Sequence, residues 1–300
     1  MKKNKILITG GTGFIGYHLA KKCIDLNWSV DSISTKLPQK KRFLKKVKYF
    51  TFDISNKKKL ENKLSVNYDY VVNLAGYVDH SNKKKTIKSH FNGCKNLAEF
   101  FLNSSIKKFV QIGSSIEYGK TKSPQKEDQK KFSNTFSYYG KAKLLSTKLL
   151  LKLFKEYKLP VTILRLYLVY GPKQDVNRII PITIFNSIKN KKFDCSSGKQ
   201  LRDFIYIDDV IEAIIKTLKN ESVSGEIINI GSGHPITIKK IIKTICRLIQ
   251  GGHPVFGKIK LRRDEVLKLY PNISKAKKLL KWKPKTNLIT GLKKTIKYLN

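Results

Sequence analysis

Short apolar runs alternate with longer amphipathic stretches along the first part of the chain. Residues 5–9 (KILIT) are apolar and partly β-branched, which predicts a strand, and residues 17–26 have the spacing of a helix with one apolar face. Further apolar runs at 28–34 and 47–52 predict two more strands. Because strands alternate with helices, the pattern predicts a parallel sheet.

The same alternation continues through the middle of the chain. Apolar runs at 70–76, 108–112 and 161–168 predict strands, and helical periodicity covers 87–102 and 138–157. Repeated strand–helix units of this kind place ligands at the carboxyl ends of the strands. We therefore predict an α/β fold, a Rossmann-type doubly wound parallel sheet.

Three glycines follow the first predicted strand directly. Gly10, Gly13 and Gly16 form a GxxGxxG pattern between that strand and the first predicted helix. The first glycine permits a tight turn, the second lets the backbone approach a pyrophosphate, and the third allows close packing of helix on strand. We predict a dinucleotide cofactor bound by these glycines and by Phe14 and Ile15.

The end of the second predicted strand bears on the choice of cofactor. NAD-specific proteins carry an acidic residue there, which accepts hydrogen bonds from the adenosine ribose. This chain has Ser34, Thr35 and Lys36 at that point, and Asp31 comes too early, in the body of the strand. Small hydroxyls and a cation suit a 2′-phosphate. The residues therefore favour NADP, with NAD as the alternative.

Two further strand ends supply candidate cofactor contacts. Asp53 and Ile54 follow the third predicted strand, where they are expected to contact the adenine. Leu74, Ala75 and Gly76 close the fourth, and their mostly small side chains let the backbone approach a ligand.

A tyrosine and a lysine open the helix predicted from residue 138 onward. Tyr139 and Lys143 are four residues apart and so share one helix face. A phenol with a pKa near 10 is a poor proton shuttle at neutral pH, and a nearby ammonium favours the phenolate. The pair is therefore a candidate for acid–base catalysis.

The strongly basic composition raises the question of whether the protein binds nucleic acids. The formal net charge is +41, but only seven of the 62 basic residues are arginine. Surfaces that read bases or clamp phosphates favour the arginine fork. The evenly spread lysines are interpreted as solvated surface, and we expect no specific nucleic-acid partner.

Composition also bears on membrane insertion, disulfide bonds and metal binding. Hydrophobic residues make up 40% of the 300 residues, which is enough for a large core. No apolar run is long enough to span a membrane, so we expect a cytoplasmic protein without a membrane partner. Four scattered cysteines and five histidines show no ligand spacing, so we expect reduced thiols and no metal.

These motifs together resemble one protein family. The sequence resembles the extended branch of the short-chain dehydrogenase/reductase family, the NAD(P)-dependent nucleotide-sugar epimerases, dehydratases and reductases. The resemblance covers essentially the whole chain. It rests on TGGTGFIG, NLAG, SSxxYG, YxxxK, RLYxVYGP, LRDFIYIDDV and YPNISKAKKLLKWKP, in that order. It implies that Ser114 hydrogen-bonds the reacting oxygen, that Tyr139 is the acid/base and that Lys143 assists it.

The resemblance also implies a division of the chain and a substrate. Residues 1–171 and 203–232 would form the NAD(P)-binding domain, and 172–202 and 233–300 a smaller α/β substrate-binding lobe. Family members commonly pair through the helix that carries YxxxK, so a homodimer is expected. The substrate would be a nucleotide sugar. Its expected contacts are Tyr77, Ser115, Arg202 and Arg262.

Within the family, the residues after Ser114 narrow the reaction. Sugar 4,6-dehydratases carry an Asp-Glu pair there, whereas this chain has Ser115 and Ile116, so dehydration is not expected. The end of the second strand and the stretch 177–204 favour a reductase that delivers hydride to C4 of a nucleotide-linked 4-keto-6-deoxyhexose. The alternative is a 4-epimerase with tightly bound NAD.

Overall fold

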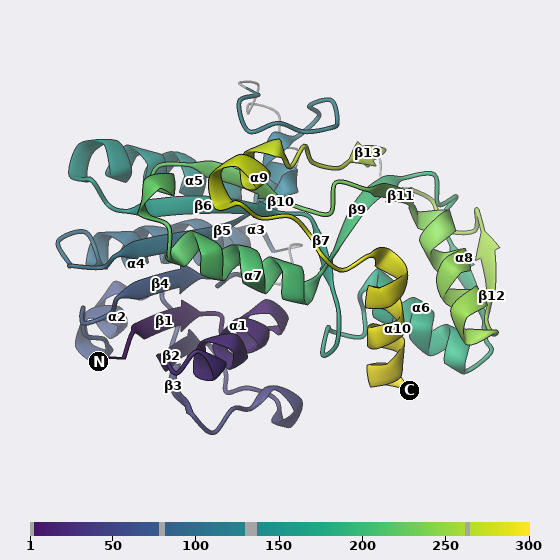
Figure 1. Cartoon of the computed structure of the whole chain (residues 1–300), viewed down its shortest axis with the longest axis horizontal. Coiled ribbons are helices and arrows are strands. Elements are labelled where there is room, and N and C mark those ends of the chain that lie inside the picture. Colours follow the sequence, from purple (N-terminus) through teal and green to yellow (C-terminus); the bar gives the residue numbers. More distant parts are fainter. Residues whose placement is uncertain (1–2, 78–81, 130–136, 262–264) are drawn as a thin grey trace.

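A parallel sheet of seven strands forms the centre of the molecule (Figure 1). The structure, a computed structural model, describes residues 3–77, 82–129, 137–261 and 265–300. The strands lie in the order β3-β2-β1-β4-β5-β6-β10, and every neighbouring pair is parallel. Their bounds are β1 Lys5–Thr9, β2 Ser29–Ser34, β3 Val47–Thr51, β4 Tyr70–Asn73, β5 Lys108–Ser114, β6 Val161–Leu166 and β10 Ile227–Ile230. The predicted doubly wound α/β fold is confirmed.

The chain order reverses between β1 and β4, which lie side by side at the centre of the sheet. Open α/β sheets bind ligands in the crevice at such a switch point, beyond the carboxyl ends of the strands. β4 ends at Asn73, earlier than predicted, because residues 74–77 leave the sheet to line this crevice. β6 ends at Leu166 because β7 (Leu168–Tyr170) pairs with a different sheet.

Helices cover both faces of the sheet, and the strand sequences show why. In β1, Ile6 and Ile8 belong to the core that also holds Leu19 of α1 (Phe14–Asp25), whereas Leu7 belongs to the core that holds Leu97 of α4 (Gly93–Phe100). Successive side chains point to opposite faces, so an uninterrupted apolar strand needs a cover on each side. The two cores provide that cover.

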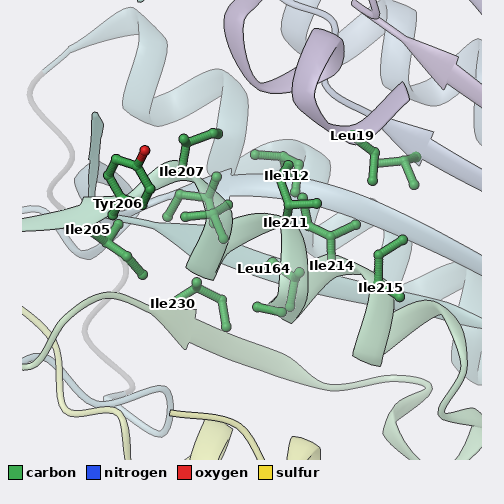
Figure 2. Close-up of a cluster of buried hydrophobic side chains, with 14 of the residues drawn as sticks. Leu19, Ile112, Leu164, Ile205, Tyr206, Ile207, Ile211, Ile214, Ile215 and Ile230 are labelled. Carbon is green, nitrogen blue, oxygen red and sulfur yellow. The ribbon is translucent and has the colours of Figure 1, made fainter. Parts of the chain in front are cut away.

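The first core is built largely by α7 (Ile207–Leu218). Figure 2 shows Ile207, Ile211 and Ile214 on this helix, close to Ile112 and Leu164 of the sheet. Helices α2 (Lys57–Lys63), α4 and α5 (Tyr138–Tyr157) build the opposite core. The helix predicted over 87–102 is α4 preceded by α3 (Lys83–Ile87) and a π-helical segment (Lys88–Asn92).

Smaller sheets and three helices form the other end of the molecule (Figure 1). β9 (Leu201–Tyr206) pairs with β7, β11 (Pro235–Thr237) and β13 (Lys268–Leu269), and β8 (Lys192–Cys195) pairs with β12 (His253–Phe256). The helices are α6 (Ile179–Ile188), α8 (Ile238–Ile249) and α10 (Leu288–Leu299), while α9 (Ser274–Leu280) lies against β10. The predicted division into two domains stays a prediction.

Two general features accompany this fold. In the part of the chain that the structure describes, no helix combines the length and apolar character needed to cross a membrane. All four cysteines are free thiols.

Candidate active site

The glycine turn after β1 is closed too tightly for any other residue. Gly10 has φ +72°, and a Cβ on it would lie 2.9 Å from the Leu74 carbonyl carbon. A Cβ on Gly16 would lie 2.4 Å from the Gly10 oxygen, which is the close helix–strand packing expected of the third glycine. Gly13 donates its N–H to the Gly10 oxygen at 3.0 Å. The turn therefore leaves α1 with its N-terminus facing the crevice.

A cavity of about 760 Å³ lies beyond the ends of β1, β2 and β4. Its lining combines the glycine turn with side chains from three strand ends. Of the predicted cofactor residues it includes Gly10, Gly13, Ser34, Thr35, Asp53, Ile54, Leu74, Ala75 and Gly76. Lys36 is exposed and does not line this cavity. The cation that favoured NADP in the sequence is therefore not part of its wall.

Residues in β2 and at its end bear on whether the cofactor is NAD or NADP. Asp31 is buried in the strand, where it accepts a hydrogen bond of 2.6 Å from the Tyr68 hydroxyl and pairs with Lys5 at 3.5 Å. The Asp31 carboxylate therefore makes its contacts inside the core. Ser34 Oγ accepts a hydrogen bond from the Thr12 N–H at 3.4 Å. The last residue of β2 thus offers a hydroxyl in place of a carboxylate.

A second cavity, of about 440 Å³, adjoins the first and shares Gly10, Leu74 and Gly76 with it. Ser114, Tyr139 and Lys143 all line this second cavity, which we call the substrate cavity. β5 carries Ser114 to the edge of the sheet, and α5 presents Tyr139 and Lys143 from its first turns. Its lining also includes the predicted residues Phe14, Ile15, Gly16, Tyr77 and Ser115.

The three side chains are hydrogen-bonded in place. The Tyr139 hydroxyl is hydrogen-bonded to Ser114, and Lys143 Nζ donates to the Ile112 carbonyl of β5 at 2.7 Å. Burial raises the pKa of Tyr139, although the bond to Ser114 lowers it, and burial lowers the pKa of Lys143. The expected lowering of the Tyr139 pKa by Lys143 is therefore not what dominates here. Desolvation favours the neutral form of each of the two groups.

A chain of buried hydrogen bonds runs across the sheet to the lysine. Thr9 Oγ1 donates to Asn73 Oδ1 at 2.5 Å, and Asn73 Nδ2 donates to Gln111 Oε1 at 2.8 Å. Gln111 Nε2 donates in turn to the Ile112 carbonyl, at 3.1 Å. That carbonyl is the acceptor of Lys143, so strands β1, β4 and β5 together hold the amine in position.

Glu117 forms the centre of a second buried network, below Ser114. Its carboxylate accepts the Ser114 N–H at 2.7 Å and the Thr147 hydroxyl of α5 at 2.8 Å. It also pairs with Arg165 of β6 at 2.9 Å, and both side chains are fully buried. Extended backbone would turn Glu117 away from Ser114, but Ser115–Tyr118 form a 3-10 turn that brings the carboxylate back as a capping box.

His90 also belongs to the site, although no motif indicated it. It lies in the π-helical segment, and its ring contacts the Tyr139 ring edge-on with centroids 4.9 Å apart. Its Nε2 lies 3.1 Å from the Tyr77 carbonyl oxygen. Segments of π-helix are often found at functional sites. No sequence spacing predicts this contact, because it depends on how the π-helical segment packs on α5.

Of the two arginines predicted to contact the diphosphate, Arg202 lies outside the lining of the substrate cavity. Arg202 on β9 is buried, and its guanidinium pairs with Glu265 and donates to the Leu201 carbonyl at 2.8 Å. It does not line the substrate cavity. Arg262 lies outside the described residues. The grip of these two arginines on a diphosphate stays a prediction, and for Arg202 it requires the pair with Glu265 to open.

Arg178 is another residue of the site that the motif-based prediction missed. It precedes α6 directly and lines the substrate cavity together with Gln174 and Asp175. Asp175 is paired with Arg42 at 2.7 Å, which ties this segment to the loop after β2. The scarcity of arginine in so basic a chain is the signal that could have drawn attention to Arg178.

Comparison with known proteins agrees with this geometry. The model of the NAD dependent epimerase/dehydratase family matches residues 6–231. The chain belongs to this family. It is therefore an enzyme of the family that acts on nucleotide sugars, and the family resemblance predicted from the motifs is confirmed.

Three similar proteins illustrate the range of the family. The UDP-N-acetyl-alpha-D-glucosaminuronate decarboxylase of Bacillus cytotoxicus is 29% identical, over 99% of this chain and 98% of that one. The UDP-glucose 4-epimerase of Thermotoga maritima, solved with UDP-glucose, has a TM-score of 0.92 and 27% identity over 98% of each chain. The UDP-glucuronic acid 4-epimerase of Bacillus cereus, solved with its substrate and NAD, has a TM-score of 0.87 and 28% identity over 98% of each chain.

None of these three relatives is a 4-ketoreductase, and the one solved with a cofactor contains NAD. The predicted likeness to 4-keto-6-deoxyhexose reductases is thus not supported by them. Between the two reactions that the sequence left open, the relatives favour the epimerase.

Proposed function

We propose that this enzyme is an NAD-dependent 4-epimerase of UDP-linked hexoses. The observation that carries the proposal is the joining of the two cavities: Ser114, Tyr139 and Lys143 line a cavity that shares its wall with the dinucleotide cleft. A sugar bound there would present one carbon both to the phenol and to the nicotinamide. Inversion at one carbon needs no further catalytic group.

The glycine turn fits a dinucleotide. A Cβ at Gly10 or Gly16 would fill the space between β1, α1 and residue 74, and the backbone there is free to approach a pyrophosphate. Asp53 and Ile54 line the part of the cavity that would hold the adenosine, and Gly13 caps α1 where the phosphates would lie. A bound nicotinamide would supply reversible hydride transfer at C4.

The proton chemistry falls to Tyr139. As the phenolate, Tyr139 would accept the proton of the 4-hydroxyl when C4 is oxidised, and as the resulting phenol it would return this proton when the ketone is reduced. Ser114 hydrogen-bonds the same oxygen, where charge develops. Lys143, held on the Ile112 carbonyl at 2.7 Å, lines the same cavity as the phenol and would hold the nicotinamide ribose. The buried phenol, whose pKa is raised, is well suited to giving the proton back.

Among the residues that the structure describes, the positions where dehydratases carry their acid/base pair hold no such pair. Ser115 and Ile116 stand where a dehydratase needs two carboxylates, and the Glu117 carboxylate is committed to Arg165, Thr147 and the Ser114 N–H. A fully buried carboxylate with three donors has no access to a sugar carbon. The site therefore supports redox chemistry at C4 without loss of water.

The 4-ketoreductase is the second candidate, favoured by one observation. Ser34 ends β2 where an acid would hold the ribose of NAD, and Asp31 is committed to Tyr68. A reductase would use NADPH once per turnover and exchange it. Lys36 does not line the cavity, which weakens the case for a 2′-phosphate.

One experiment separates the two candidates. The purified protein is denatured and its released nucleotide identified, and a second sample is incubated with UDP-glucose and with UDP-glucuronate without added cofactor. The epimerase predicts released NAD and formation of the C4 epimer, seen by proton NMR. An absence of bound nucleotide, together with NADPH-dependent reduction of a UDP-4-keto-6-deoxyhexose, would replace the proposal by the reductase.

A further inference from the structure

The substrate cavity contains one charged side chain that the fold itself leaves unused. Lys143 donates to the Ile112 carbonyl, and Asp175 pairs with Arg42 at 2.7 Å. The guanidinium of Arg178 has no hydrogen-bond or ion-pair partner among the residues that the structure describes, and the side chain is exposed to the cavity it lines. A cation kept free in a binding site is available for a ligand.

The position of Arg178 relative to the reacting group is informative. The residue directly precedes α6, and its N–H donates to the Asp175 carbonyl at 3.1 Å, which fixes the backbone. It lines the same cavity as Tyr139 and Ser114, and its charge lowers the pKa of the Tyr139 phenol. Arg178 therefore lies in the wall of the cavity that would hold the reacting part of the sugar.

We propose that Arg178 binds a carboxylate on the sugar ring, so that the preferred substrate is a nucleotide-linked hexuronic acid. This inference rests on the proposed function, which sets C4 of the sugar against Tyr139. A guanidinium forms two parallel, charge-assisted hydrogen bonds with a planar carboxylate. An uncharged hydroxymethyl group in the same place would leave that fork without a matching acceptor.

The geometry of a hexopyranose distinguishes a carboxylate from the other anion of the substrate. The C6 carboxylate is attached to C5, directly beside C4. The diphosphate is attached to C1, on the opposite side of the ring. Because Arg178 lines the same cavity as Tyr139, which would meet C4, the carboxylate beside C4 is the anion that we assign to it.

The rest of the lining that the structure describes includes the hydroxyls of Ser115 and Tyr77, and Lys143, which is held on the Ile112 carbonyl. Leu166, Leu168 and Val169 are apolar, and Gln174 Nε2 already donates to the Val169 carbonyl at 2.8 Å. The charge of Asp175, which would repel a carboxylate, is compensated by Arg42. Selection for an acidic sugar therefore depends on Arg178.

The test compares two substrates in matched variants. Values of kcat/KM are measured for UDP-glucuronate and UDP-glucose with the wild type, Arg178→Gln, Arg178→Lys and the control Arg247→Gln, which changes an exposed arginine of α8 outside the cavity. The wild type is expected to favour UDP-glucuronate. Arg178→Gln should lower the ratio of the two kcat/KM values about 10- to 100-fold, as expected for a lost charge-assisted bond. Arg178→Lys should fall between, and the control should match the wild type.

Two outcomes overturn the proposal. A wild type that favours UDP-glucose contradicts it directly. An equal loss for both substrates in Arg178→Gln assigns the guanidinium to the diphosphate or to the phenol instead.

A binding measurement keeps this inference separate from the proposed function. In the Tyr139→Phe protein with NAD present, dissociation constants for UDP-glucuronate and UDP-glucose are measured with and without Arg178→Gln. The carboxylate contact predicts a selective 10- to 100-fold weakening for UDP-glucuronate. If the wild type epimerises neither sugar, the proposed function fails, but this ratio of dissociation constants still decides the role of Arg178.

Discussion

At the scale of the residue, the chemistry of this site is set by desolvation. Tyr139 and Lys143 are both buried, and burial moves the pKa of the phenol up and that of the amine down, toward the neutral form of each. The bond from Ser114 and the charge of Arg178 partly offset this effect on Tyr139. The phenol is therefore tuned by the groups around the substrate.

Replacing Tyr139 by Phe removes only the proton-carrying oxygen. Turnover should fall about 100- to 10,000-fold, because proton transfer at C4 loses its acid and base. NAD affinity should change little, which is measured by titration of nucleotide-free protein. The neighbouring Tyr138, 43% exposed, is the control, since Tyr138→Phe should retain turnover. Near wild-type turnover in Tyr139→Phe would refute the assignment.

Lys108 gives a second prediction at this scale. It is fully buried at the start of β5, donates to the Glu221 carbonyl and to Ser224 Oγ, and burial lowers its pKa from 10.5 to about 8. The folded state therefore loses its proton first, and stability rises between about pH 8 and 10.5. The free energy of unfolding of the wild type relative to Lys108→Met should increase over this range, by an amount on the order of 3 kcal/mol.

Urea titrations at several pH values measure this difference, and the comparison with Lys108→Met cancels the contribution of the other lysines. A difference that stays constant with pH would show that Lys108 titrates alike in both states.

At the scale of the elements, one carboxylate holds three of them together. Glu117 follows β5 and binds Thr147 on α5 and Arg165 on β6, and Arg165 also lies over the Tyr118 ring at 4.3 Å. These elements carry Ser114, Tyr139 and Lys143. The relative placement of the three proposed catalytic groups therefore depends on a buried ion pair.

Glu117→Gln should cost about 3 to 5 kcal/mol in the free energy of unfolding, because Arg165 keeps a buried charge without its partner. Because the Glu117 charge raises the pKa of both Tyr139 and Lys143, the pH profile of the remaining activity should move to lower pH. Chemical denaturation and pH–rate curves measure the two effects. Glu156→Gln, at an exposed pair on α5, is the control and should stay near the wild type.

A loss of less than 1 kcal/mol in Glu117→Gln would show that the network is hydrated or redundant.

At the scale of the whole molecule, charge opposes folding. Sixty-two basic residues face only 21 acidic ones, so most surface lysines have no counter-charge nearby. Such self-repulsion destabilises the compact state and is screened by salt, with a Debye length of about 10 Å at 0.1 M. The homodimer expected from the family stays a prediction, which sedimentation at micromolar concentration tests.

Sodium chloride should therefore raise the melting temperature by several degrees between low and roughly physiological salt, where the Debye length falls below about 10 Å. Calorimetry or fluorescence in a salt series measures this. A melting temperature that is flat or falls with salt would mean that ion pairs outweigh the repulsion.

The sequence by itself determined the order of strands and helices up to residue 168, the glycine turn and the four-residue spacing of Tyr139 and Lys143. These depend on local spacing: period-two and helical patterns, a turn that only glycine can make, and a four-residue step on one helix. The N-terminal half of the fold followed because parallel strand–helix units leave few alternatives.

Only the tertiary structure decided which charged side chains are paired within the protein. Glu117 binds Arg165, 48 residues away, and Asp175 binds Arg42, 133 residues away, so neither pairing has a local signature. His90 reaches Tyr139 through helix packing, and Arg202 is engaged by Glu265. These groups are held by long-range ion pairs and by burial, both of which depend on how distant segments pack. Arg178 has no such partner among the described residues, and it lines the same cavity as Tyr139.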